Sequence, residues 1–150
     1  MPALKLFVKA RREALNNNCT DNGGAIHSIE RIVDILSMGI VYPHLSHINN
    51  LKKEETAPRS SAADKARKKG QRVLIEHVAP RRDYSRKICE LIEEKNFTDK
   101  KIIDFIKKNY ELVLLTEQET KHLNKINRSE MSPTRLEDAG IDVLDRKKQK

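Results

Sequence analysis

The chain has 150 residues, of which 37% are hydrophobic and 35% charged, so it can close one modest core without disulfides or metal staples. Its net charge is +8 at pH 7. No stretch approaches the roughly 18 apolar residues of a membrane span, and the first residues lack the apolar core of a signal peptide. We therefore expect a cytoplasmic protein with no membrane partner and a single domain over residues 1–144.

The first part of the chain predicts two amphipathic helices. Residues 3–16 place apolar side chains near one face and basic side chains on the other. A second helix should open at the glycine pair 23–24 and end at Gly39. Residues 43–60 are polar and contain prolines and asparagines, which predicts a mobile loop. The second helix carries the clearest apolar stripe of the chain, at three- and four-residue spacing: Ile26, Ile29, Ile32, Val33 and Leu36.

The middle of the chain combines a basic helix with a short strand. Ser61 and Asp64 have the spacing of a capping box, and Gly70 suits a left-handed helix end. Residues 62–69 should therefore form a short and very basic helix. Residues 72–78 are β-branched and apolar, which predicts a strand.

The following segments predict two helices, a strand and a further helix. Residues 84–95 and 99–109 are expected to form helices that pack as a helical hairpin. Residues 112–115 are the second predicted strand. This strand runs directly into a capping box at residues 116–119, which starts a helix that ends at about residue 127.

The end of the chain completes the predicted fold. Ser132 should cap a last short helix that Gly140 ends, and the charged tail, residues 145–150, is expected to be disordered. The elements together predict an α+β fold, predominantly helical, with a short two-stranded β-hairpin and a following helix (ββα-like) plus added helices. The two strands should pair, since a lone strand leaves its ladder groups unpaired.

The excess positive charge is concentrated in one segment. Between residues 59 and 82, eight basic residues face only two acidic ones. Such clustering attracts phosphate through counterion release, so we predict DNA or RNA as the partner. A solvated helix face or a mobile basic loop is the alternative interpretation, and an anionic membrane is disfavoured because no large aromatic or leucine face accompanies the charge. The residues expected to contact nucleic acid are Lys65, Arg67, Lys68, Lys69, Arg72, Arg81 and Arg82.

Two segments resemble a known family. The run EHVAP, residues 76–80, ends the first predicted strand, and the run LLTEQETKHLN, residues 114–124, leads from the second strand into a helix. Over residues 72–127 the sequence is similar to the HNH, or ββα-metal, nuclease superfamily. The resemblance implies a metal-dependent endonuclease that hydrolyses phosphodiesters, with His77 as the general base. It also implies Glu76 and Asn124 as ligands of a divalent cofactor, Mg²⁺ or Mn²⁺.

Such a site needs hard ligands that hold the ion with open positions, and a histidine that takes a proton from water. Adjacent strand residues point to opposite faces, so a kink before Pro80 is needed for Glu76 and His77 to reach one phosphate. The sequence departs from the family pattern: Thr120 stands where the family usually has a histidine, and Glu111 where its central asparagine often sits. About thirty residues also separate strands that the family usually joins more tightly.

Three functions therefore remain open: a nuclease, a non-catalytic DNA- or RNA-binding protein, and a protein-interaction module such as an inhibitor or adaptor with a basic surface. His44 and His47 are three residues apart, a spacing that can bind zinc, but no cysteine or carboxylate cluster lies near them. Cys19 and Cys89 are isolated in the sequence, which indicates neither a disulfide framework nor a zinc site. The sequence does not predict an oligomeric state.

Overall fold

The computed structural model describes residues 1–145. Its fold is α+β and 59% helical, which confirms the predicted class. The chain divides into two compact units, each built from two separate stretches. Unit 1 is Met1–Pro43 with Arg81–Asn109, and unit 2 is His44–Pro80 with the chain from Tyr110 onward. The single domain over residues 1–144 stays a prediction, since compact units of this kind also occur within one domain.

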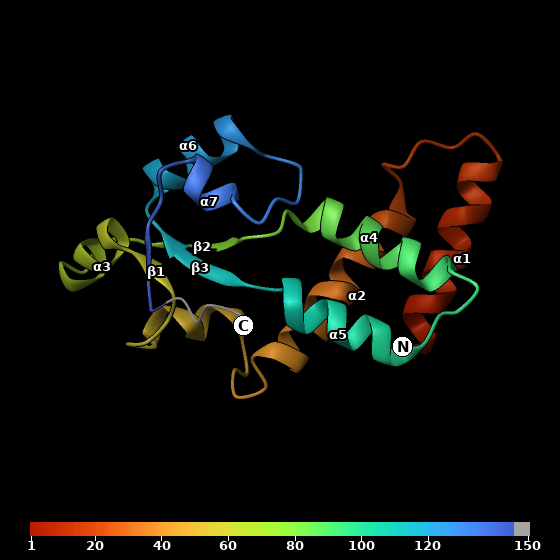
Figure 1. The fold of residues 1–150 in the computed structure, drawn as a ribbon, viewed down its shortest axis with the longest axis horizontal. Helices are drawn as coiled ribbons and strands as arrows, with labels where there is room; N and C mark the ends of the chain where they lie inside the picture. Colours follow the sequence, from red (N-terminus) through yellow and green to blue (C-terminus); the bar gives the residue numbers. More distant parts are fainter. Residues whose placement is uncertain (146–150) are drawn as a thin grey trace. The chain divides into compact units, whose positions relative to one another are not determined.

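Unit 1 is helical and contains α1 (Pro2–Asn16), α2 (Gly24–Val41), α4 (Arg81–Glu93) and α5 (Asp99–Asn109). Helix α2 packs against the other three helices, and α4 packs against α5 (Figure 1). The predicted helices and the helical hairpin are thereby confirmed. The core consists of apolar side chains that recur at helical spacing, among them Leu4, Ile26, Ile29, Ile88, Ile102 and Ile106.

The boundaries of two helices in unit 1 differ from the prediction. Helix α2 continues past Gly39 and ends at Val41, because the proline at position 43 disfavours helical backbone at Tyr42. Helix α4 begins at Arg81, three residues earlier than predicted, and carries Asp83 in its first turn, where a carboxylate is favourable.

Unit 2 contains a small mixed sheet. Its strands are β1 (Arg59–Ser60), β2 (Leu74–His77), β3 (Leu112–Leu115) and β4 (Val143–Leu144), in the order β2-β3-β1-β4. Strands β2 and β3 are antiparallel and pair along their full length, so the predicted pairing of these two strands is confirmed. Strand β1 lies parallel to β3 and antiparallel to β4.

The predicted two-stranded hairpin is wrong, because β1 and β4 add two strands and α4 and α5 separate β2 from β3 in the chain. Each added strand has two residues, which is too short to produce an alternating pattern in the sequence. Their pairing arises from contacts between segments far apart in the chain, since Arg59 lies opposite both Leu114 and Leu144.

Four short helices complete the described part of unit 2: the 3-10 helix η1 (Ile48–Lys53), α3 (Ser61–Lys68), α6 (Glu117–Ile126) and α7 (Arg135–Asp138). Helix η1 lies inside the predicted loop of residues 43–60, so that prediction is wrong there. Helix η1 is held in place because its residue Leu51 is buried in the core.

Helix caps account for the remaining differences in unit 2. Helix α3 is capped by Ser60, whose Oγ accepts a hydrogen bond from the Ala63 amide, one residue before the predicted cap. Ser132 does not cap α7 but accepts a hydrogen bond from the Thr134 amide, and α7 begins at Arg135. The predicted left-handed end at Gly70 is confirmed, with φ of +68°, and Gly140, predicted to end the last helix, also has a positive φ of +66°.

The core of unit 2 joins the sheet to its last two helices. Leu123 of α6 packs on one face of β3, against Val113 and Leu115, and the cluster continues through Leu136, Ala139 and Ile141. Helix α6 begins with the predicted capping box, in which Thr116 and Glu119 bond each other's backbone amides. The paired strands β2 and β3, with α6 directly after β3, form a ββα arrangement in which α4 and α5 lie between the two strands in the chain (Figure 1).

Within residues 1–145, every helix is too short or too polar to cross a membrane. The predicted disorder of the tail lies outside the described residues, apart from Asp145.

Candidate nucleic-acid interface

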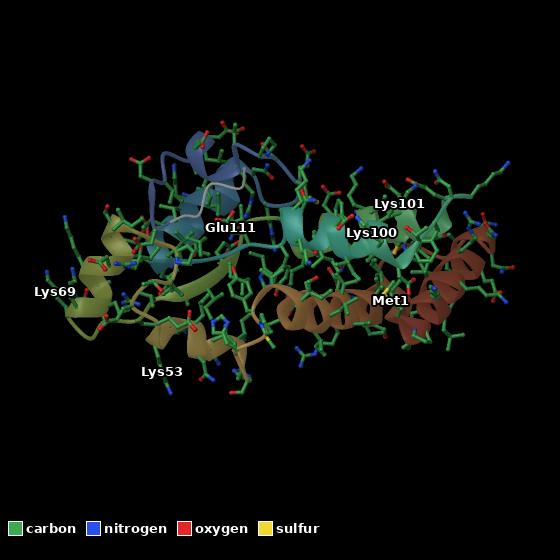
Figure 2. All side chains as sticks on the ribbon, turned by 60° about the horizontal axis from the view of Figure 1, so that its bottom comes forward. Met1, Lys53, Lys69, Lys100, Lys101 and Glu111 are labelled. Carbon is green, nitrogen blue, oxygen red and sulfur yellow. The ribbon has the colours of Figure 1, made fainter. Side chains whose placement is uncertain are left out.

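The exposed side of α3 carries the cations that the sequence singled out. Ala63, Asp64 and Ala66 are buried, whereas Lys65, Lys68 and Lys69 meet solvent. Lys65, Lys69 and Arg72 are exposed and make no hydrogen bond or ion pair with other residues in the described part of the chain. Figure 2 shows Lys69 at the outer end of α3. These three side chains are the cations of the segment that are best placed for an external anion, and we call them the α3 cations.

Arg67 lies on the same helix but has structural partners. Its Nη1 donates to the Glu54 carbonyl oxygen at 2.5 Å, and its Nη2 donates to the Glu55 carbonyl oxygen at 3.2 Å. Arg67 therefore holds the segment after η1 against α3, and its guanidinium is largely occupied by these carbonyls.

Asp64 neutralises two further cations of the segment. Its carboxylate accepts hydrogen bonds from Lys68 Nζ at 2.7 Å and from Arg59 Nε at 2.5 Å. The hydrogen bonds from Lys68 and then Arg59 lower the pKa of Asp64 to about 2. Arg59 also donates to Asp145 at 2.6 Å, so β1, α3 and the end of β4 share one charge network.

We expect unit 2 to lose stability as the pH falls from 3.8 towards about 2, because the pKa of Asp64 is lower in the folded than in the unfolded chain. Its contribution is fully present above the unfolded value and is lost on protonation. Urea unfolding of wild type and Asp64→Asn at pH 5, 3 and 2 gives the free energy of unfolding of each protein. The difference in this free energy between wild type and Asp64→Asn should shrink with falling pH. Asp142→Asn, a change at an exposed site, serves as the control. A difference in free energy of unfolding between wild type and Asp64→Asn that stays constant from pH 5 to pH 2 contradicts the prediction.

The other two predicted contact residues, Arg81 and Arg82, begin α4 and belong to unit 1. Arg81 is exposed. Arg82 Nε donates to Glu30 Oε1 at 2.8 Å, and its Nη1 donates to the Asn22 side chain at 3.1 Å. A run that is continuous in sequence is thus divided between two units, and Arg82 is engaged within its own unit.

The predicted metal ligand Glu76 and the predicted base His77 point to opposite faces of β2, as adjacent strand residues do. Glu76 lies opposite Val113, on the face that α6 and α7 cover, and its Oε1 is 3.5 Å from Arg135 Nη2. His77 lies opposite Leu112 and packs edge-on against Tyr110 at a centroid distance of 5.8 Å. The kink that would bring Glu76 and His77 together is not formed.

Arg135 was not identified from the sequence, yet it holds the end of β2 in place. Its side chain is 1% exposed. Nε donates to the Asn127 carbonyl oxygen at 2.9 Å, and Nη1 donates to the carbonyl oxygens of His77 at 2.9 Å and Val78 at 3.1 Å. Burial lowers the pKa of Arg135, but a guanidinium remains charged in proteins. A single arginine in a short C-terminal segment carries no periodic signal that could have revealed this role.

The residues implied as metal ligands do not fit a divalent ion. The carboxylate of Glu76 already pairs with the buried guanidinium of Arg135, and Asn124 is exposed on α6. Within residues 1–145, no group of three or more His, Cys, Asp and Glu side chains is arranged to hold a metal. His44 and His47 make separate local contacts, with Glu54 and the Asn49 amide.

Thr120, which stands at the family's usual histidine position, has a buried hydroxyl. Its Oγ1 has no hydrogen-bond partner among the described residues. Because a buried hydroxyl without a partner costs free energy, we expect Thr120→Val to raise the free energy of unfolding by about 1 kcal/mol. Thr120→Ser, which keeps the hydroxyl, should not raise it. Urea unfolding followed by circular dichroism measures both, and a valine variant less stable than wild type contradicts the prediction.

Neither a known protein family, nor a curated protein, nor a solved structure matches the chain. The resemblance to the HNH superfamily over residues 72–127 therefore stays a prediction.

Proposed function

We propose that this protein binds DNA or RNA through the exposed side of α3 and the turn that follows it, with Lys65, Lys69 and Arg72 contacting phosphates. The observation that carries the proposal is the exposure of all three α3 cations together with the absence of ion pairs to other described residues. Neighbouring basic residues have partners, since Arg67 bonds carbonyls and Lys68 bonds Asp64. Unpaired cations that cluster on one helix end are an electrostatic footprint for a phosphate backbone. A cytoplasmic location is part of this proposal.

Fluorescence anisotropy with a labelled 20-base-pair duplex and a labelled single strand tests the proposal. Binding should be measured between 50 and 200 mM salt. We expect the logarithm of the binding constant to fall linearly with the logarithm of the salt concentration, because each neutralised phosphate releases counterions. A protein that binds neither probe at the lowest salt contradicts the proposal and favours the protein-interaction module.

Metal-dependent phosphodiester hydrolysis is the second candidate function. It is supported by the ββα order, in which β3 pairs with β2 and leads directly into α6. The side chains of Glu76 and His77 do not converge on one point. If this candidate holds, supercoiled plasmid is nicked in the presence of Mg²⁺ or Mn²⁺, and His77→Ala abolishes nicking without unfolding the protein. Plasmid that stays supercoiled with Mg²⁺, Mn²⁺, Ni²⁺ and Zn²⁺ contradicts it.

A further inference from the structure

The turn between α1 and α2 contains the only Asn-Gly pair of the sequence, Asn22 and Gly23. Both residues are exposed, and Gly23 is the last residue before α2. Within residues 1–145, the amide nitrogen of Gly23 donates no hydrogen bond to another residue. A glycine also lacks the Cβ that shields the amide nitrogen of other residues. The Gly23 amide is therefore open to reaction with a neighbouring group.

The side-chain amide of Asn22 is held at its oxygen. Asn22 Oδ1 accepts a hydrogen bond from Arg82 Nη1 at 3.1 Å, and Arg82 Nε donates to Glu30 Oε1 at 2.8 Å, which keeps the guanidinium in place. A cationic donor at this oxygen stabilises the negative charge that develops on it when the side-chain carbon is attacked. The nitrogen Nδ2 of Asn22 makes no hydrogen bond with another described residue, so it can leave.

We propose that Asn22 is a site of spontaneous deamidation, in which the Gly23 amide nitrogen attacks Cγ of Asn22 and Arg82 stabilises the oxygen of the tetrahedral intermediate. Water takes the proton of the attacking N–H. The bond between Cγ and Nδ2 then breaks, and ammonia leaves with a proton from water. One water molecule opens the resulting succinimide ring at either carbonyl, which gives aspartate or isoaspartate. Asparagine and water are thus converted to a carboxylate and ammonium, and no oxidant or reductant is needed.

The surrounding contacts suit the carboxylate of the aspartate product. In this network three guanidinium groups bond two carboxylates, those of Arg11, Arg86 and Arg82 against those of Asp21 and Glu30. A third carboxylate balances the count and turns the contact with the Arg82 guanidinium into a stronger, charge-assisted hydrogen bond. It also lies just before the first turn of α2, where a negative charge is favourable. We therefore expect the aspartate form to be more stable than the unmodified protein.

Incubation of wild type at about pH 8 and 37 °C, sampled over several weeks, tests the proposal. Tryptic digestion gives one peptide, residues 13–31, that contains Asn22 together with Asn16, Asn17 and Asn18. Tandem mass spectrometry assigns the mass gain of an amide that becomes a carboxyl group to one of these four residues. We expect the gain at Asn22, and the other three serve as internal controls because none of them precedes a glycine. A gain at Asn22 that is no faster than at the other three overturns the proposal.

Two variants test the parts of the mechanism. Gly23→Ala places a methyl group beside the attacking nitrogen, and alanine fits because φ is −85° and nothing lies within 4 Å of the added Cβ. The rate should fall on the order of tenfold, which corresponds to about 1.4 kcal/mol on the barrier. Arg82→Lys keeps a charge beside Glu30 but lacks the fork that also reaches Asn22, so the rate should fall about threefold, the effect of one lost hydrogen bond. Circular dichroism checks both folds. A rate equal to or above that of wild type in either variant overturns the mechanism.

Asn22→Asp carries the product carboxylate from the start and tests the effect on stability. Its equilibrium constant of unfolding, from urea titrations, should be about two- to fivefold lower than that of wild type. Asn96→Asp makes the same change at an exposed residue between α4 and α5 of the same unit and should leave the constant nearly unchanged. An Asn22→Asp protein that unfolds more readily than wild type overturns the inference that the network accommodates the new charge.

Discussion

Replacing Arg135 by methionine is expected to lower the free energy of unfolding by about 3–5 kcal/mol, the cost of removing one partner from a buried ionic contact. The guanidinium is 1% exposed and bonds the carbonyl oxygens of Asn127, His77 and Val78. Methionine fills a similar volume but leaves these carbonyls and the Glu76 carboxylate without their donor. Urea unfolding of wild type and variant, followed by circular dichroism, measures the loss.

Two further variants make this result specific. Arg135→Lys keeps the charge, but a single ammonium lacks the planar fork that reaches all three carbonyls, so its loss should be intermediate. Arg128→Met changes an exposed arginine in the same part of the chain and should stay within about 0.5 kcal/mol of wild type. An Arg135→Met variant as stable as Arg128→Met would show that the guanidinium does not hold the end of β2.

The triple variant Lys65→Gln, Lys69→Gln, Arg72→Gln is expected to weaken nucleic-acid binding at least about tenfold at low salt and to reduce the salt slope by about 2.7, or 0.9 for each lost contact with duplex DNA. Arg67 and Lys68 are left in place because they bond Glu54 and Asp64, and their removal would confuse a loss of binding with a loss of structure. Anisotropy titrations at several salt concentrations measure both quantities.

The matched control removes the same charge from unit 1. Lys95, Lys108 and Arg31 are exposed, and their replacement by glutamine should leave the slope close to that of wild type. Circular dichroism of both variants checks that the fold is retained. A triple α3 variant with the wild-type slope would remove α3 from the binding surface.

Local patterns in the sequence were enough to predict most of the secondary structure. The stripe of Ile26, Ile29 and Val33 specifies a helix because an apolar face at that spacing must be buried. Thr116 and Glu119 specify the start of α6 because each satisfies an amide of the other. Gly70 and Gly140 mark helix ends because they adopt positive φ without a Cβ penalty. Each signal acts within a few residues, so neighbouring residues alone were sufficient.

The sequence by itself thus determined the helical α+β class, the pairing of β2 with β3, and the cations of α3. Only the tertiary structure decided which of those cations are available, because Arg67 and Lys68 meet partners whose positions depend on chain folding. It also decided that no kink brings Glu76 to His77, since β2 pairs regularly with β3 through His77 and Arg135, 59 positions after Glu76, pairs with the carboxylate on the α7 side. Strands β1 and β4 form for the same reason: two residues each carry no periodicity, and their ladder groups are satisfied only by segments brought together in the folded chain.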